Sequence, residues 1–198
     1  MRLPPERAAA AASLLGRAFA NDPAFRWALP DDEKRATQLT WLAERLLRLT
    51  TLSNGVIDAL DEQPSAVALW VPVEKPWEEP LRLLFHAGLF ASPFVLGLTA
   101  VRRLAVMGTP MTLMHRTFAP IPHDYLMQLA VEPREQGRGL GSALLKAGLE
   151  RSGRTGRAVW LETTNQRNIA FYERHGFVVK GRRSLPNDVT LVGMLREP

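Results

Sequence analysis

Glycines stand at three alternate positions, Gly137, Gly139 and Gly141, directly before a run of good helix formers. Glycine has no Cβ, so it permits backbone dihedrals that other residues disfavour and lets a ligand approach the main chain closely. The free N–H groups at a helix N-terminus, together with the helix dipole, form a ready site for an anion. The spacing therefore predicts a loop that holds a phosphate or pyrophosphate group.

Two well-known phosphate-binding loops fit this stretch less well. A Walker loop requires Gly-Lys followed by Ser or Thr, and the chain contains no Gly-Lys pair. The dinucleotide fingerprint G-x-G-x-x-G fits Gly137 and Gly139 but requires glycine where Ser142 stands. Glu162 lies near the spacing of the acidic residue in that fingerprint, so a nicotinamide-dependent reductase remains an alternative.

A different pattern, Q-x-x-G-x-G from Gln136 to Gly141, follows the apolar stretch "LMQLAV" and the turn "EP". It resembles the acetyl-coenzyme A-binding motif of the GNAT superfamily of N-acetyltransferases. The later stretch "NIAFYERHGF", Asn168 to Phe177, resembles a second segment of that superfamily, with its tyrosine and its Gly-Phe pair. Both segments occur in the expected order with a strand between them, and the most similar subgroup is the puromycin N-acetyltransferase-like enzymes.

The resemblance implies acetyl-coenzyme A as the acyl donor. Its pyrophosphate would lie against the glycine loop, and its pantetheine arm would lie along the preceding strand, whose main chain can pair with the pantetheine amides. The residues assigned to the donor in this way are Leu129, Ala130, Val131, Gln136, Gly137, Arg138, Gly139, Leu140, Gly141, Ser142, Asn168 and Tyr172.

Acetyl transfer to an amine needs an acid and a base. By resemblance, Tyr172 is the general acid that protonates or hydrogen-bonds the departing thiolate. An alkyl amine is mostly protonated at pH 7, so a carboxylate is needed to remove its proton. Glu162, at the end of the strand "AVWLET", is the candidate base, and Asp22, Asp31 and Asp32 are alternatives that could bind a cationic acceptor.

Hydrophobic periodicity and turn signals predict the elements that position these residues. Helices are expected over 5–19, 31–49, 140–152 and 168–175, and strands over 55–60, 65–73, 125–131, 158–163, 177–180 and 189–195. This alternation predicts an α/β (α+β) protein with a mixed central sheet of about six to seven strands flanked by helices, as in the GNAT fold. The segment "NDP" at 21–23 is expected to be a turn, and only Met1–Leu3 remain for the first strand that the resemblance implies.

We expect residues 1–198 to form a single domain with a helical insertion at 74–122 on the acceptor side, interrupted by Pro80, Pro93, Gly97 and Pro110. Leu83–Val101 contains no Asp, Glu, Lys or Arg and approaches the roughly 20 residues that cross a bilayer. A break at Pro93 would divide it into two short helices that cover a pocket, so no membrane partner is expected.

Composition narrows the remaining classes. The chain has no cysteine, and its four histidines lack ligand spacing, so no metal site is expected. The positive excess lies in residues 132–198, which hold 12 basic and 7 acidic side chains, and this favours an anionic partner such as a phosphorylated donor. The arginine pairs 102–103 and 182–183 are isolated, so a nucleic-acid-binding module is disfavoured.

The sequence therefore predicts a cytoplasmic N-acetyltransferase, a monomer or homodimer, whose acceptor is the primary amine of a small, partly hydrophobic molecule. The amine of a protein or peptide is the alternative acceptor. The apolar segments within 73–126 favour a closed pocket over an open peptide groove.

Overall fold

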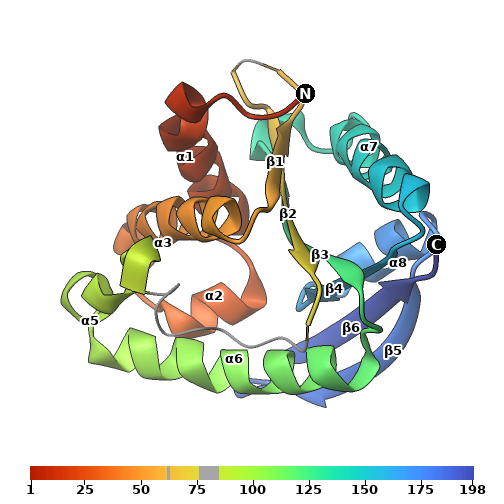
Figure 1. Cartoon of the computed structure of the whole chain (residues 1–198). Coiled ribbons are helices and arrows are strands. Elements are labelled where there is room, and N and C mark those ends of the chain that lie inside the picture. The colour runs from red at the N-terminus through yellow and green to blue at the C-terminus, as the bar shows by residue number, and fades with distance from the viewer. Residues whose placement is uncertain (62, 76–84) are drawn as a thin grey trace.

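The computed structural model describes residues 1–61, 63–75 and 85–198 and shows one mixed sheet with helices on both faces (Figure 1). The strands are β1 (Val56–Ala59), β2 (Ala66–Val73), β3 (His123–Val131), β4 (Ala158–Thr163), β5 (Val178–Ser184) and β6 (Thr190–Arg196). Their order across the sheet is β1-β2-β3-β4-β6-β5; β3 and β4 are parallel and the other neighbours antiparallel. The predicted mixed sheet flanked by helices is confirmed, with six strands in the described part.

The α-helices that lie wholly within the described residues are α1 (Ala8–Phe19), α2 (Pro23–Ala28), α3 (Asp32–Leu52), α5 (Ser92–Val95), α6 (Leu98–Phe118), α7 (Leu140–Arg154) and α8 (Arg167–Glu173). Three short 3₁₀ turns, η1 (Pro5–Arg7), η2 (Leu89–Ala91) and η3 (Pro133–Glu135), join or precede them. Helices α1, α2, α3 and α6 cover one face of the sheet, and α7 and α8 cover the other (Figure 1).

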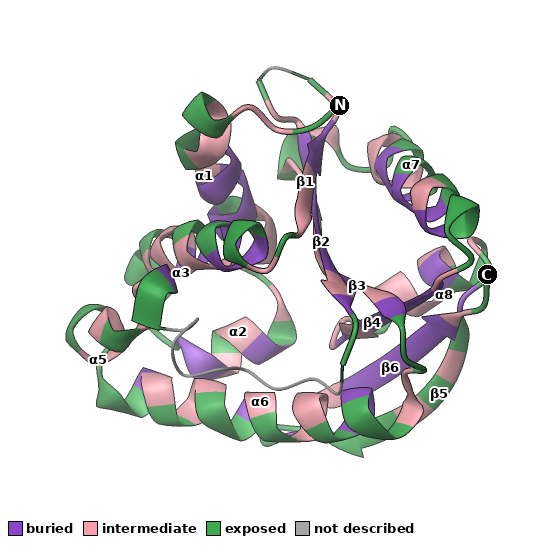
Figure 2. Ribbon diagram, viewed as in Figure 1, coloured by how far each residue is buried: buried purple, intermediate pink, exposed green. Residues whose placement is uncertain are grey.

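Alternate residues of the central strands pack into hydrophobic cores on opposite faces of the sheet, because successive side chains of a strand point to opposite faces. On β4, Val159 and Leu161 pack with α7 and α8, whereas Trp160 packs with α6. On β2, Trp70 faces α7, where Gly148 leaves room for its indole. Buried residues follow the inward sides of α1 and α7, while α6 is exposed on its outer side (Figure 2). The sheet thus separates the cores under α1, α2, α3 and α6 from the core under α7 and α8, and each strand residue faces one of these two sides according to its position in the strand.

The N-terminal residues add a minimal extra strand to the sheet edge. The amide of Leu3 donates to the carbonyl of Ile57 at 2.8 Å, and the amide of Ala59 donates to the carbonyl of Met1 at 2.9 Å. Arg2 and Asp58 form an isolated antiparallel bridge. The first strand implied by the resemblance is therefore present here only as a short bridge.

The predicted turn at 21–23 is wrong in one respect, because it opens helix α2. Asp22 is the N-cap of α2, and its side chain accepts from the amides of Ala24 at 2.9 Å and Phe25 at 3.4 Å. Pro23 follows as the first helical residue, where its missing N–H and fixed φ suit a helix start. An aspartate before a proline signalled this helix as well as it signalled a turn.

The helix breaks within 85–118 lie at other residues than the sequence predicted, apart from Gly97. Helix α6 continues through Pro110 without a break, and the carbonyl that loses its partner there is that of Val106, an exposed residue. Pro93 lies at the start of α5, and the breaks occur at Gly88 and Gly97, with φ of 85° and 86°. Pro80 lies outside the described residues, as do residues 83–84 of the apolar segment. In the described chain, no helix has the length and apolar character needed to span a membrane.

Candidate active site

The parallel strands β3 and β4 separate at the centre of the sheet. They pair only from His123 to Tyr125 on β3 and from Ala158 to Trp160 on β4. Beyond these pairs each strand continues, β3 to Val131 and β4 to Thr163, without further pairing to the other. The result is a V-shaped opening at the carboxyl ends of two parallel strands, a position where open α/β sheets bind ligands.

The glycine loop lies at the end of β3 and leads into α7. Gly137 and Gly139 have φ of 80° and 83°, in the left-handed region that other residues rarely adopt, and Gly139 is the N-cap of α7. A Cβ at Gly141 would lie 3.3 Å from Val131 Cγ2, so this glycine allows the helix to approach the strand closely. The side-chain Nε2 of Gln136 donates to the carbonyl of Val131 at 3.3 Å and fixes the loop against the strand.

A cleft of about 650 Å³ lies along the strand, the loop and α8. All of the residues assigned to the donor from the sequence line it except Arg138, which forms an ion pair with Glu135. The further lining residues are Arg17, Ala18, Phe19, Asn21, Asp22, Pro133, Glu135, Asn165, Arg167, Phe171 and Arg174. Helix N-terminal amides, two left-handed glycines and arginines on one cleft form a suitable surface for a pyrophosphate.

Tyr172 projects from α8 into the same cleft and is 7% exposed. Its ring packs edge-on against Phe171 and Phe177, with centroid separations of 5.1 Å and 5.6 Å. Burial raises the pKa of its hydroxyl above the ordinary value, because a phenolate would be poorly solvated there. The hydroxyl is thus a hydrogen-bond donor suited to a nearby anion, and full proton transfer from it is uphill.

Glu162 occupies the opposite face of the sheet and does not line the cleft. Its side chain is 2% exposed, and the indole N–H of Trp160 donates to Oε1 at 2.5 Å. Oε2 is buried and has no hydrogen-bond partner among the described residues. Burial raises the pKa of this carboxyl to about 7, although hydrogen bonds from Trp160 and Tyr125 act in the other direction.

A buried histidine pair lies beside Glu162. The Nε2 atoms of His115 and His123 are 2.7 Å apart, and His115 Nδ1 lies 3.7 Å from Glu162 Oε1. His123 Nδ1 lies 2.5 Å from the carbonyl oxygen of Pro120; because a carbonyl only accepts, this nitrogen carries the proton. Burial, and then the neighbouring His123, lowers the pKa of His115 to about 3. No signal in the sequence indicated this pair, since the two residues come from α6 and β3 and no local motif joins them.

Asp22 is the alternative carboxylate that the fold brings to the cleft. The hydroxyl of Thr164, just beyond β4, donates to Asp22 Oδ1 at 3.0 Å and to Oδ2 at 3.2 Å. Burial raises the pKa of Asp22, and hydrogen bonds from Thr164 and the first amides of α2 partly offset it. Asp31 and Asp32 are exposed at the start of α3 and do not line the cleft.

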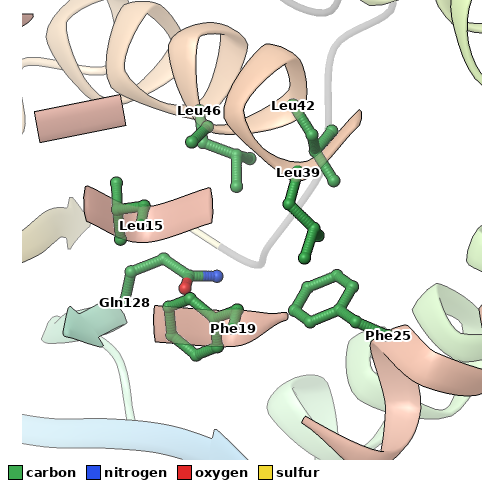
Figure 3. Close-up of a pocket in the computed structure, with 8 residues that line it drawn as sticks. Leu15, Phe19, Phe25, Leu39, Leu42, Leu46 and Gln128 are labelled. Carbon is green, nitrogen blue, oxygen red and sulfur yellow. The ribbon is translucent and has the colours of Figure 1, made fainter. Parts of the chain in front are cut away.

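A small apolar pocket adjoins the cleft on the α1–α3 side (Figure 3). It has a volume of about 20 Å³, and its lining residues are Leu15, Phe19, Phe25, Leu39, Leu42, Ala43, Leu46 and Gln128. Phe19 lines both the pocket and the cleft, and Gln128 is the one polar side chain among those that line the pocket. Neither space is lined by a residue of α5 or α6, although acceptor contacts were expected from this insertion. In the described residues no group of three or more His, Cys, Asp or Glu side chains suits a metal ion.

Comparisons with known proteins agree with this geometry. Residues 110–179 match the family model described as an acetyltransferase (GNAT) domain. A solved Corynebacterium glutamicum protein, described as histone acetyltransferase HPA2 and related acetyltransferase, is 27% identical with a TM-score of 0.70, over 100% of this chain and 94% of that one.

Two further structures share the fold at lower identity. Arylalkylamine N-acetyltransferase 2 from Aedes aegypti is 12% identical with a TM-score of 0.60, over 100% of this chain and 97% of that one. The Drosophila melanogaster polyamine N-acetyltransferase is 14% identical with a TM-score of 0.56, over 98% and 96%. Residues 110–179 thus match a GNAT acetyltransferase domain, and this match, together with the C. glutamicum structure, supports an acetyl-transfer enzyme.

Proposed function

We propose that the chain transfers the acetyl group of acetyl-coenzyme A to the primary amine of a small, partly hydrophobic molecule, by direct attack within a ternary complex. The observation that carries this proposal is the single cleft that unites the glycine loop, the free edge of β3 and Tyr172. Acetyl-coenzyme A supplies a thioester as the acyl donor. A pyrophosphate fits the loop, because Gly137 and Gly139 have open space around them and the N-terminus of α7 follows directly.

The chain's own residues would divide the work as follows. Amides of the loop and of α7 hold the pyrophosphate, and Gln136 keeps the loop against β3. The unpaired edge of β3 at Leu129–Val131 orients the pantetheine arm and offers fixed main-chain groups near the thioester. Tyr172 donates a hydrogen bond to the sulfur as the C–S bond breaks, a step that general acids accelerate.

The acceptor assignment rests on the side of the cleft away from the loop. Phe19 connects the cleft to the apolar pocket, and of the two acidic residues that line the cleft, Glu135 is already paired with Arg138. The cleft, with Phe19 on its wall and Asp22 as its other acidic residue, suits one ammonium group attached to an apolar body rather than a polyamine. A puromycin-like aminonucleoside is one candidate. We take residues 1–198 as one domain, in which the helices of 74–122 form an insertion.

The experiment is a thiol-release assay with acetyl-coenzyme A across hydrophobic amines, polyamines, and histone-tail and ribosomal-protein peptides. Release with hydrophobic monoamines, together with their N-acetylated products by mass spectrometry, is the expected result. Acetylation of a protein amine is the second candidate, because the C. glutamicum relative is described as a histone acetyltransferase. Turnover of peptides alone would establish that candidate in place of the first.

A further inference from the structure

Two partly or fully buried carboxylates, Asp22 and Glu162, lie near the opening between β3 and β4, on the face of the sheet opposite α7 and α8. We propose that Asp22, rather than Glu162, is the catalytic carboxylate that receives the acceptor's ammonium group and takes its proton. This inference rests on the proposed N-acetyltransferase function and specifies its acceptor side.

The location of Asp22 is the first argument. Asp22 lines the cleft together with Tyr172 and Val131. It lies between α1 and α2, and its hydrogen-bond partner Thr164 follows β4. Asp22 therefore connects the helical side of the cleft to the end of β4, beside the opening. Glu162 is sealed beneath α6, where Trp160 and His115 surround its carboxylate, and it has no surface on the cleft.

The bonding of Asp22 is the second argument. Oδ1 accepts from the amides of Ala24 and Phe25 and from the Thr164 hydroxyl, whereas Oδ2 accepts, among the residues that the structure describes, only from Thr164, at 3.2 Å. A carboxylate oxygen accepts about two hydrogen bonds, so Oδ2 keeps capacity for a further donor. An ammonium group can bind there while Oδ1 continues to cap α2.

Asp31 provides a comparison within the same chain. It caps α3 with the same local pattern, accepting from the amides of Glu33 at 3.2 Å and Lys34 at 3.1 Å. Asp31 is exposed and paired with the Lys34 ammonium, which lowers its pKa. Asp22 has no ion-pair partner among the described residues, and burial raises its pKa. Helix capping does not require a buried carboxylate with a raised pKa, whereas a proton acceptor that works near neutral pH benefits from one.

The proton balance is simple. The ammonium N–H bond breaks and its proton passes to Asp22 Oδ2, which leaves the nitrogen lone pair free. That lone pair forms the new bond to the acetyl carbon, and the electron pair of the C–S bond departs on sulfur, to which the Tyr172 hydroxyl donates a hydrogen bond. The nitrogen then loses its second proton to the thiolate, so the products are the N-acetylated amine, the coenzyme A thiol and the proton held on Asp22. The apolar part of the acceptor would lie against Phe19, which lines the cleft and whose ring packs edge-on against Phe25 at a centroid separation of 5.8 Å.

The test compares three single variants, Asp22→Asn, Asp31→Asn and Glu162→Gln, with one alkyl amine accepted by the wild type. Asparagine caps helices about as well as aspartate, so both aspartate variants should remain folded. We expect Asp22→Asn to lower kcat/KM for the amine by roughly 100- to 10,000-fold, with acetyl-coenzyme A affinity unchanged by calorimetry. Asp31→Asn should stay within about twofold of the wild type.

An arylamine acceptor separates chemistry from structure. Its nitrogen is already deprotonated at pH 7, so it needs no base before attack. The deficit of Asp22→Asn should therefore be at least about tenfold smaller for the arylamine than for the alkyl amine, a difference that a misplaced helix would not produce. If Asp22→Asn does not fold, Thr164→Val, which removes the hydroxyl bonded to Asp22, replaces it and should show the same acceptor-dependent deficit.

The outcomes separate the two proposals. Near-normal turnover of Asp22→Asn, with loss in Glu162→Gln, would overturn the assignment of Asp22 and leave the acetyltransferase intact. An equal deficit for alkyl and aryl amines would also overturn it. Failure of the wild type to bind acetyl-coenzyme A would instead defeat the proposed function itself.

Discussion

The two faces of the sheet differ in how their functional groups are encoded. On the α7–α8 face, the loop and helix residues that line the cleft come from two short segments, 133–142 and 165–174. On the opposite face, Asp22, Glu162 and the two buried histidines come from four elements that only the folded sheet brings together. In the proposed function, the donor is recognised largely by the backbone of a local motif, whereas the acceptor side would depend on individual side chains that are distant in sequence.

The largest expected effect is on the donor face. Gly139→Asp places a side chain at φ 83° and adds a negative charge where the pyrophosphate would lie. Acetyl-coenzyme A affinity measured by calorimetry should fall by more than about 100-fold, while the fold survives by circular dichroism. Unchanged affinity would remove the difference between the two faces, because the loop would then have no donor to hold.

Tyr172→Phe addresses the one side chain of the donor face that we expect to act chemically. It keeps the ring between Phe171 and Phe177 and deletes only the hydroxyl. Turnover in the thiol-release assay should fall roughly 10- to 1000-fold with little change in acetyl-coenzyme A binding. A variant with normal turnover would make Tyr172 a packing residue.

Glu162→Gln examines the opposite face through pH. The folded protein holds the carboxyl with a raised pKa of about 7, so between about pH 4.5 and 7 it binds a proton that the unfolded chain releases. The free energy of unfolding should therefore fall as pH rises through this window, by up to roughly 3 kcal/mol from this residue. Urea unfolding of the wild type and Glu162→Gln at pH 5 and 7.5 isolates the contribution, since the histidine pair is common to both. A wild-type pH dependence identical to that of the variant would show that Glu162 is not held in this way.

Helix α7 offers the smallest effect and a matched pair. A Cβ at Gly148 would lie 2.0 Å from Trp70 Cζ2, whereas one at Gly153 meets nothing within 4 Å. Gly148→Ala should destabilise the protein by about 1–3 kcal/mol through overpacking. Gly153→Ala, on the same helix, should be neutral or stabilising by about 0.5–1 kcal/mol. Equal thermal stability of the two variants would contradict the packing of α7 against β2.

The sequence predicted the sheet and the glycine loop because each has a local signal. Short apolar runs marked β2, β3 and β4, and the spacing of glycines marked the entry to α7. Strand periodicity also predicted that Glu162 lies on the face opposite Leu161. The structure confirms this, because Leu161 packs on the α7–α8 face and Glu162 lies beside His115 of α6. Periodicity did not show that α6 would cover Glu162, since that depends on how a helix distant in sequence packs.

The acceptor side was less predictable for the same reason. The first residues of α2 were interpreted as a turn, and a role for Asp22 was only one of three open choices among Asp22, Asp31 and Asp32. Asp22 differs from Asp31 because it accepts a hydrogen bond from Thr164 and lines the cleft. Both features depend on residues that are distant in sequence, so the local sequence does not indicate them. Likewise, the spacing of His115 and His123 in the sequence matched no metal-binding motif, and it did not indicate that their rings would be in contact.

Amide hydrogen–deuterium exchange of the wild-type protein, with and without acetyl-coenzyme A, tests the central claim most directly. The donor should slow exchange at residues 129–142 and 165–174, which line the cleft, and leave α6 at 98–118 unchanged. Protection confined to α6, or no protection at saturating acetyl-coenzyme A, would contradict the assignment of this cleft as the donor site.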